Sequence, residues 1–268
     1  MDTVITFIIP VRHQDNASDW PRLKVNLAQT ARSIRAQTNK QWRAIVVAND
    51  GADLPELPDG FEVVSVQFAP NPKYDLHCDD REAIYDAVRL DKGRRILAGM
   101  LHAKKTDYFM VVDDDDFVHQ DLVAFAASNP GANGWRINEG LVWDDGGRLL
   151  LLNSDFNNLC GTSLVIKAKL YNLPAHFEEA SEDFIKTMLG SHVMIAKILN
   201  DRGSPLAPLP FVGAIYRVGH AGSHSKSKGI IRKYFLNKNA LKNPVQLVAN
   251  LIRLQFLSSN IKKAYFGF

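Results

Sequence analysis

The feature that most constrains the fold is a series of short apolar segments separated by helical patterns and turns. Four of these segments are expected to be buried strands: Thr3–Ile9, Trp42–Ala48, Glu62–Phe68 and Tyr108–Val112. Leu23–Ala36 carries apolar residues at helical spacing, and a basic helix is expected from about Asp91 to Ala103. Strands that alternate with helices at this spacing form βαβ units with right-handed crossovers. We therefore expect an α/β fold with a mainly parallel sheet.

The second half of the chain has a less regular pattern. Three further strands are expected at Leu149–Asn153, Ser163–Ile166 and Ala214–Val218. A helix is expected over Ser191–Asp201, because Gly203 stands where a helix C-cap commonly lies. After Ser223 the chain becomes a basic tail, in which Asn243–Leu257 has the pattern of an amphipathic helix.

Length and composition narrow the class of protein. The chain has 268 residues, of which 46% are hydrophobic and 23% charged, as in ordinary globular domains. The longest uncharged stretches, such as Pro205–Tyr216, are shorter than the roughly 20 residues that span a bilayer. The start lacks a signal-peptide pattern, and Cys78 and Cys160 form no CxxC pair. We expect a cytoplasmic protein whose cysteines are packing residues.

The charges are distributed unevenly along the chain. Residues 202–268 contain eleven Lys or Arg and no Asp or Glu, which leaves 21 basic and 29 acidic residues in 1–201. A basic tail on an acidic body is typical of a protein that docks on an anionic surface. The alternative is a solvated basic face that aids solubility.

Four aspartates, Asp113–Asp116, follow the fourth expected strand directly. Carboxylates in succession repel one another, and a hard divalent cation compensates them most directly because Mg²⁺ and Mn²⁺ prefer oxygen ligands. In an extended segment alternate side chains point the same way, so Asp113 and Asp115 can face one site. The alternative is an exposed acidic turn that caps the next helix.

In the order IIPVRH, VVANDGA, LDKGRRILAGMLHA and YFMVVDDDDFV, the sequence resembles the GT-A-fold glycosyltransferases, particularly the inverting family two. The resemblance spans about Val4–Val118 and continues more weakly to about Ser225. It implies a metal-dependent transfer of a sugar from a nucleoside diphosphate sugar, with UDP favoured, to a hydroxyl of a glycan or lipid-linked acceptor. Mn²⁺ or Mg²⁺ is the implied cofactor, and inversion is the implied outcome.

The same resemblance implies a GT-A-like (Rossmann-like), mostly parallel sheet flanked by helices, to which the charge and apolar pattern of the tail adds a basic C-terminal helical extension. Residues 1–118 correspond to the nucleotide-sugar half and 119–225 to the acceptor half of the same domain, with 226–268 as the amphipathic tail. The tail would allow peripheral contact with an anionic membrane on its inner face. Nucleic acid is not expected as a partner, because the tail has no interleaved aromatic platform.

The resemblance also assigns donor-site residues. Asp50 corresponds to an acid that binds the nucleotide base, although Asn49 stands where an Asp is common. Pro10 and Arg12 correspond to the segment that lines base and ribose. The stretch beside base and phosphates corresponds to Lys92, Gly93 and Arg94. Asp113 matches a ribose or sugar contact and Asp115 a metal ligand, and Asp114 can substitute because the register of the run is ambiguous.

An inverting transfer needs a general base that accepts the proton of the acceptor hydroxyl. The family places an acidic pair at the start of a helix, and two stretches compete for that position. Glu182 and Asp183 supply acids directly, whereas His192 heads the helix that better matches the pattern. The segment beginning at Tyr216 resembles one that ends in a metal- or diphosphate-binding histidine, which is His220 or His224 here.

Two other functions compete with the transferase. A sugar-phosphate nucleotidyltransferase normally has a glycine-rich loop after the first strand, and Pro10–Asp15 lacks one. A non-catalytic sugar-nucleotide- or glycan-binding protein is favoured by the absence of an acid at position 192. Trp135, Trp143 and Phe156 are either core residues or surfaces on which an acceptor sugar stacks.

Overall fold

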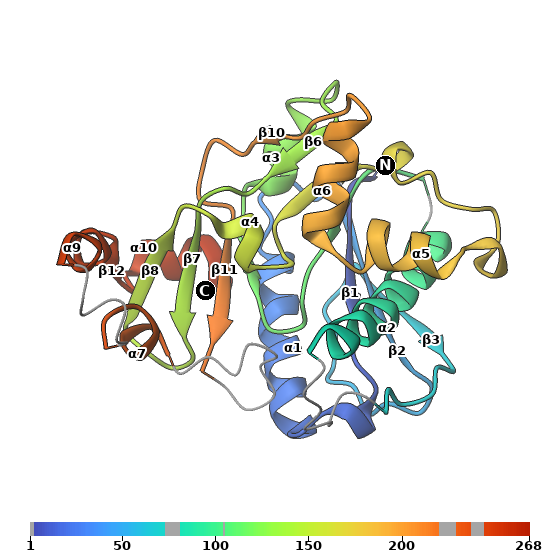
Figure 1. Ribbon diagram of the computed structural model, residues 1–268, viewed down its shortest axis with the longest axis horizontal. Helices are drawn as coiled ribbons and strands as arrows, with labels where there is room; N and C mark the ends of the chain where they lie inside the picture. The colour runs from blue at the N-terminus through green and yellow to red at the C-terminus, as the bar shows by residue number, and fades with distance from the viewer. Residues whose placement is uncertain (1–2, 73–80, 104, 220–228, 237–243) are drawn as a thin grey trace.

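The computed structural model describes residues 3–72, 81–103, 105–219, 229–236 and 244–268. Two β-sheets, each accompanied by helices, account for most of this part of the chain (Figure 1). The larger sheet has seven strands and the smaller one five. Most of the site residues predicted from the sequence lie at or near the larger sheet.

The seven-stranded sheet has the order β10-β6-β9-β4-β1-β2-β3. Its strands are β1 (Thr3–Pro10), β2 (Trp42–Asn49), β3 (Phe61–Val66), β4 (Thr106–Val111), β6 (Gly134–Arg136), β9 (Leu164–Lys167) and β10 (Ala207–Pro208). Strand β9 runs antiparallel to β4 and β6, and all other neighbours in the sheet are parallel. The predicted α/β class with a mostly parallel sheet is therefore confirmed.

Helices cover both faces of this sheet. On one face Phe7 and Ile9 of β1 share a core with Leu27 of α1 (Trp20–Arg35) and with α3 (Leu122–Ala127). On the other face Ile8 shares a core with α2 (Arg81–His102), α6 (His192–Asp201) and the π-helical turn Ile185–Leu189. Because successive strand side chains enter opposite cores, the central strands are apolar throughout.

The five-stranded sheet has the order β12-β8-β7-β11-β5 and was only partly predicted. Its strands are β5 (Phe117–Val118), β7 (Gly140–Asp144), β8 (Leu149–Asn153), β11 (Ala214–Val218) and β12 (Leu254–Phe256). Strands β8 and β11 have the predicted bounds. Strands β5, β7 and β12 were not predicted, and β5 and β12 have only two and three residues.

The short helices and turns connect these elements. They are α4 (Phe156–Leu159), α5 (Glu182–Phe184), α7 (Ile230–Tyr234), α9 (Pro244–Ile252), α10 (Ser259–Ile261), the 3-10 turns Gln14–Asn16, Ala168–Tyr171 and Phe177–Glu179, and the π-helical turn Lys262–Phe266. Helix α2 begins about ten residues before its predicted start, and α6 matches its predicted range closely.

The C-terminal segment differs from the single helix predicted over Asn243–Leu257. Helix α9 ends at Ile252, because the next residues form β12 and pair with β8. Farther on, Tyr265 and Phe266 are buried beside Phe117 and Trp143 of the five-stranded sheet. Within the described ranges, the structure contains no helix of the length and apolar character needed to cross a bilayer.

Candidate functional site

Polar side chains follow three parallel strands at one edge of the seven-stranded sheet. Arg12 follows β1, Asp50 follows β2, and Asp113 follows β4. Strands β1, β2 and β4 are neighbours and parallel, so their carboxyl ends lie together. Ligands of open α/β sheets bind at this edge. The sequence-predicted residues are thus brought to the edge that the fold class uses for binding.

The aspartate run is largely buried. Asp116 is fully buried, while Asp114 and Asp115 are 6% and 9% exposed. Only the Asp113 side chain is appreciably exposed, at 30%. Strand β5 follows the run immediately, and α3 starts only at Leu122. The alternative of an exposed acidic turn that caps the next helix is therefore wrong.

Asp116 holds the turn together. Its Oδ2 accepts hydrogen bonds from Thr162 Oγ1 at 2.6 Å and from Cys160 Sγ at 3.1 Å, and its Oδ1 accepts from the backbone N–H of Arg217 at 3.2 Å. Thr162 Oγ1 also accepts from the backbone N–H of Asp113 at 2.9 Å. Burial raises the pKa of Asp116, and the charges of Asp115 and Asp113 raise it further. Asp116 is a structural member of the run.

Asp113 is joined to α2 by Lys92. Lys92 Nζ donates to Asp113 Oδ1 at 2.5 Å, and the two side chains are 25% and 30% exposed. Burial alone lowers the pKa of Lys92, but the charge and hydrogen bond of Asp113 outweigh it, and the pKa is raised. A side chain at Gly161 would meet both Lys92 Nζ and Asp113 Oδ2. The glycine leaves room beside the ion pair.

His192 lies beside this ion pair. It is the first residue of α6, whose N-cap Ser191 accepts from the Met194 N–H at 3.3 Å. Burial and the charge of Lys92 lower the pKa of His192 to about 4, so the imidazole is neutral at pH 7. Its Nε2 is buried and has no hydrogen-bond partner. A cavity of about 20 Å³, large enough for a single water, adjoins His192, Lys92 and Gly161.

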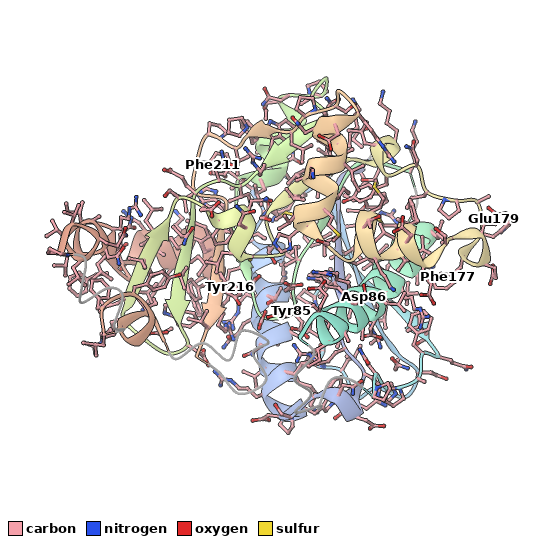
Figure 2. All side chains as sticks on the ribbon, in the orientation of Figure 1. Tyr85, Asp86, Phe177, Glu179, Phe211 and Tyr216 are labelled. Atoms are coloured by element: carbon pink, nitrogen blue, oxygen red, sulfur yellow. The ribbon has the colours of Figure 1, made fainter. Side chains whose placement is uncertain are left out.

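Glu182 and Asp183 lie apart from this cluster, on α5. Both residues are exposed. Glu182 pairs with Arg94 at 4.0 Å and with Lys186 at 3.5 Å. Lys186 also pairs at 2.7 Å with Asp86 of α2, a residue labelled in Figure 2. Arg94 therefore faces α5, whereas Lys92 faces Asp113. The two predicted cations of α2 do not converge on one point.

Gly93 brings α2 close to the π-helical turn Ile185–Leu189. A Cβ at position 93 would overlap the backbone carbonyl oxygen of Ile185. Only glycine permits this approach without displacing one of the two segments. The structure thus gives Gly93 a packing contact that sequence reasoning did not predict.

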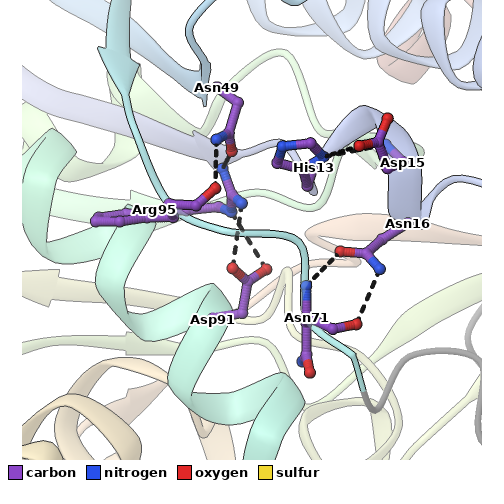
Figure 3. A network of polar contacts seen from close by, with 8 residues as sticks. His13, Asp15, Asn16, Asn49, Asn71, Asp91 and Arg95 are labelled. Carbon is purple, nitrogen blue, oxygen red and sulfur yellow. Dashed lines mark hydrogen bonds and ion pairs between the residues drawn. The ribbon is translucent and has the colours of Figure 1, made fainter.

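Arg95 was missed by the sequence analysis. Its guanidinium is buried and donates to both carboxylate oxygens of Asp91, at 3.1 and 3.2 Å, and to Asn49 Oδ1 at 2.7 Å (Figure 3). Asn49 Nδ2 donates to the carbonyl of Phe68 at 2.6 Å. The network fixes the end of β2 to α2, and the i, i+4 spacing of Asp91 and Arg95 was a usable signal.

The loop after β1 is anchored by asparagine. Asn16 Nδ2 donates to the carbonyl of Asn71 at 2.9 Å, and its Oδ1 accepts from the Asn71 N–H at 2.7 Å (Figure 3). His13 Nδ1 accepts from the Asp15 N–H at 3.1 Å. Pro10 is the buried last residue of β1, and Arg12 is half-buried in the segment that follows. These contacts join the loops beyond β1 and β3.

Arg217 of β11 is a second buried cation that sequence reasoning did not single out. Its guanidinium donates to Asn26 and, at 2.5 Å, to Gln29 of α1, and it lies 4.6 Å from the Phe117 ring centre. Burial lowers the pKa of Arg217 to about 10, while the charges of Asp115, Asp116 and Asp114 act in the opposite direction. Arg217 therefore compensates part of the charge of the aspartate run.

The remaining predicted residues are placed as follows. Asp50 is exposed, and its Oδ1 accepts from the Gly51 N–H at 3.1 Å. His220, His224 and Cys78 lie outside the described residues. Trp135, Trp143, Phe156 and Cys160 are buried in the core, which settles the choice between packing and surface roles. In the part of the chain that the structure describes, no three His, Cys, Asp or Glu side chains are grouped to hold a metal ion.

Comparisons with known proteins find likenesses among solved structures. Neither a family model nor a curated protein matches the sequence. A crystal structure of S. aureus TarS 1–349 is 11% identical, with a TM-score of 0.46, over 80% of this chain and 60% of that chain. A second structure of S. aureus TarS is 13% identical, with a TM-score of 0.42, over 81% and 37%. The match thus spans less than two thirds of either TarS chain.

A third crystal structure, of Rv0371C from Mycobacterium tuberculosis H37Rv in complex with manganese, is 12% identical. It aligns over 81% of this chain and 92% of that chain, with a TM-score of 0.33. Likeness at such low identity and TM-score does not show a function, so a function has to be inferred from the geometry of the site.

Proposed function

We propose that this chain is a metal-dependent, GT-A-type glycosyltransferase that moves a sugar from a nucleoside diphosphate sugar to a hydroxyl group, with inversion. The observation that carries the proposal is the cluster of Asp113, Lys92 and His192 beyond the end of β4. It combines an acid, a cation and a neutral imidazole at the edge where α/β sheets bind ligands. The acceptor is a glycan or a lipid-linked saccharide.

The donor is proposed to lie along the ends of β1, β2 and β4. Asp50 would bind the base, with Pro10 and Arg12 beside base and ribose, and UDP is the favoured nucleotide. Among Lys92, Gly93 and Arg94, the ammonium of Lys92 is the group adjacent to Asp113, and a cation there suits a diphosphate. Asp113 would contact the ribose or sugar.

The metal, Mn²⁺ or Mg²⁺, would be held by Asp115 and Asp113, with Asp114 as a substitute and His220 or His224 as a further ligand. The oxygen-rich set fits a hard cation, and Mg²⁺ commonly takes only one or two protein carboxylates together with substrate phosphates. Asp114 and Asp115 are 6% and 9% exposed, and Arg217 compensates part of their charge, so one divalent ion would suffice to balance the rest of the run. The metal would neutralise charge on the departing diphosphate.

His192 is the proposed general base, and Asp183 and Glu182 are the alternatives. The position of His192 beside Lys92 and Asp113 supports it, because a base must lie close to the reacting centre. Its imidazole is already neutral and has Nε2 free to accept a proton. A bound diphosphate would raise the pKa of His192 above the value of about 4 that it has without ligands.

A thermal-shift panel of UDP-, GDP-, CDP- and dTDP-sugars, each with and without Mn²⁺, tests the proposal. A bound donor stabilises the native state, so one nucleotide is expected to raise the melting temperature in a Mn²⁺-dependent manner. Asp115→Ala should abolish the Mn²⁺-dependent part of the shift. A shift that is unchanged in Asp115→Ala contradicts the metal assignment, and no shift with any sugar nucleotide contradicts the function.

A non-catalytic sugar-nucleotide-binding protein is the second candidate, favoured by the burial of His192 Nε2 and by its low pKa. Donor hydrolysis measured with Mn²⁺ separates the two candidates. A protein that only binds the donor shows the thermal shift without releasing nucleoside diphosphate. Replacement of His192 with Ala, compared with Asp183→Asn and Glu182→Gln, then identifies the base among the three.

We also propose that the enzyme works at the cytoplasmic side of a membrane. Residues 226–268 would make a peripheral contact with anionic lipid, because 202–268 contain no acidic residue. This placement would suit a lipid-linked acceptor. Flotation of the protein with anionic vesicles tests the contact independently of catalysis.

A further inference from the structure

Helix α9 presents an apolar face to the outside of the molecule. Val245 and Ile252 are each 78% exposed, Val248 and Leu251 are 56% and 58% exposed, and Phe256 of β12 is 77% exposed. We call these five residues the α9 face. Large apolar side chains are normally scattered on a surface, so five exposed within twelve residues indicate an interaction site.

The orientation of α9 is the reverse of that of an ordinary surface helix. Asn250 is its buried residue, 5% exposed. Asn250 Nδ2 donates to the carbonyl of Tyr234 at 2.9 Å, and its Oδ1 accepts from Gln246 Nε2 at 2.9 Å. The polar side chain anchors the helix to α7, and the apolar side chains are turned outward. A surface helix normally buries its apolar stripe and exposes polar residues.

Basic residues border the α9 face. Arg253 follows Ile252 directly, and the exposed Arg148 lies opposite Leu257, the residue after Phe256, because the Arg148 carbonyl accepts from the Leu257 N–H at 2.9 Å. Helix α9 lies at one end of the molecule, beyond β8 and β12 and away from β1–β4 (Figure 1). The face can therefore meet a flat surface without covering the candidate site.

We propose that the α9 face inserts into the interfacial region of an anionic lipid bilayer, with Arg148 and Arg253 at the level of the headgroups. The inference deepens the membrane contact proposed above and rests on it. The nine residues of α9 are too short to span a bilayer, but they suit a helix lying in its plane. An apolar face bordered by cations complements acyl chains covered by anionic headgroups.

Vesicle binding by the full chain tests this inference. The probes are vesicles of phosphatidylcholine alone and vesicles that also contain phosphatidylglycerol, each at low and high salt. The double variant Leu251→Ser, Ile252→Ser should reduce partitioning onto anionic vesicles by about tenfold or more, because each apolar side chain loses its burial in lipid. Arg253→Gln should reduce it about fivefold and weaken the salt dependence.

Val63→Ser is the matched control, because Val63 is a 49% exposed apolar residue on β3 of the other sheet. The control should bind vesicles as the parent protein does. Because the substituted residues are exposed, the double variant should retain the parent melting temperature and the sugar-nucleotide thermal shift. These two readouts separate a failure of the inference from a failure of the transferase function.

Three results would overturn the inference. If the double variant binds vesicles as the parent protein does, the α9 face does not insert into lipid, although the membrane contact through 226–268 can still hold. If the parent protein binds no vesicles, both the insertion of the α9 face and the membrane contact through 226–268 are wrong. A parent protein that self-associates in analytical ultracentrifugation without binding vesicles, and that the double variant makes monomeric, shows instead that the face binds a second copy of this chain.

Discussion

Lys92 Nζ donates to Asp113 Oδ1 at 2.5 Å, and this bond joins the middle of α2 to the aspartate run that follows β4. Gly161 lies against both partners, and His192 is close enough for its pKa to respond to both charges. The pair therefore lies where residues 1–118 meet Gly161 and His192 of the second half, at the proposed donor site.

Replacement of Lys92 with Gln should weaken binding of the nucleoside diphosphate. A hydrogen bond to a charged group contributes about 1.5–3 kcal/mol, so the dissociation constant should rise roughly tenfold to a hundredfold. Isothermal titration calorimetry with UDP and Mn²⁺ measures the change. Arg89→Gln on the same helix removes an ion pair to the exposed Glu82 and should leave affinity within about twofold. Equal affinity in the two variants would contradict the role of Lys92.

Replacement of Asp116 with Asn should destabilise the fold. Both oxygens of Asp116 accept hydrogen bonds, and an amide NH₂ would face the Thr162 hydroxyl and Cys160 thiol, or the Arg217 N–H. We expect a loss of about 2–4 kcal/mol in the free energy of unfolding, measured by urea denaturation. Asp115→Asn should lose less than about 1 kcal/mol and fail instead in Mn²⁺-dependent donor binding. If the two variants exchange these phenotypes, the register of the metal-binding acids is wrong.

The stability of the protein should fall in acid, in part because of His192. Its pKa is about 4 in the folded state and near 6.5 when unfolded, so the unfolded state binds the proton first as pH falls. The stability is fully present above pH 6.5 and decreases between about pH 6.5 and 4, by up to about 3 kcal/mol. His192→Gln should lack this contribution. Urea unfolding at several pH values measures the free energy of unfolding of both proteins. The difference between the parent protein and His192→Gln should shrink as the pH falls from 6.5 to 4, and a constant difference would contradict the assignment.

Replacement of Gly93 with Ala should destabilise the contact between α2 and the π-helical turn Ile185–Leu189. The new Cβ overlaps the Ile185 carbonyl oxygen, and strain of this kind costs about 1–3 kcal/mol. That cost exceeds the gain of about 1 kcal/mol that alanine brings to a helix. Thermal unfolding measures the effect, and Arg89→Ala on the same helix is the control. A Gly93→Ala protein with unchanged stability but weaker donor binding would favour the direct phosphate role implied by the resemblance.

Several elements were predictable because their signal is local. The apolar runs of β1, β2 and β4 have both faces in a core, so periodicity and length identify them without knowledge of their partners. Helix α6 has a serine N-cap and a glycine after its end, both visible in the sequence. The small strands β5 and β12 carry no such signal. They form because β11 and β8 offer them backbone hydrogen bonds.

The sequence by itself determined that four carboxylates follow a buried strand and that a basic segment ends the chain. Only the tertiary structure decided which carboxylate is structural. Asp116 is the one whose oxygens meet donors from Thr162, Cys160 and Arg217, residues 44 to 101 positions away. In the same way α9 turns its apolar side outward because Asn250 binds the carbonyl of Tyr234. Periodicity shows that a helix has two faces, but the direction of each face depends on contacts between segments distant in sequence.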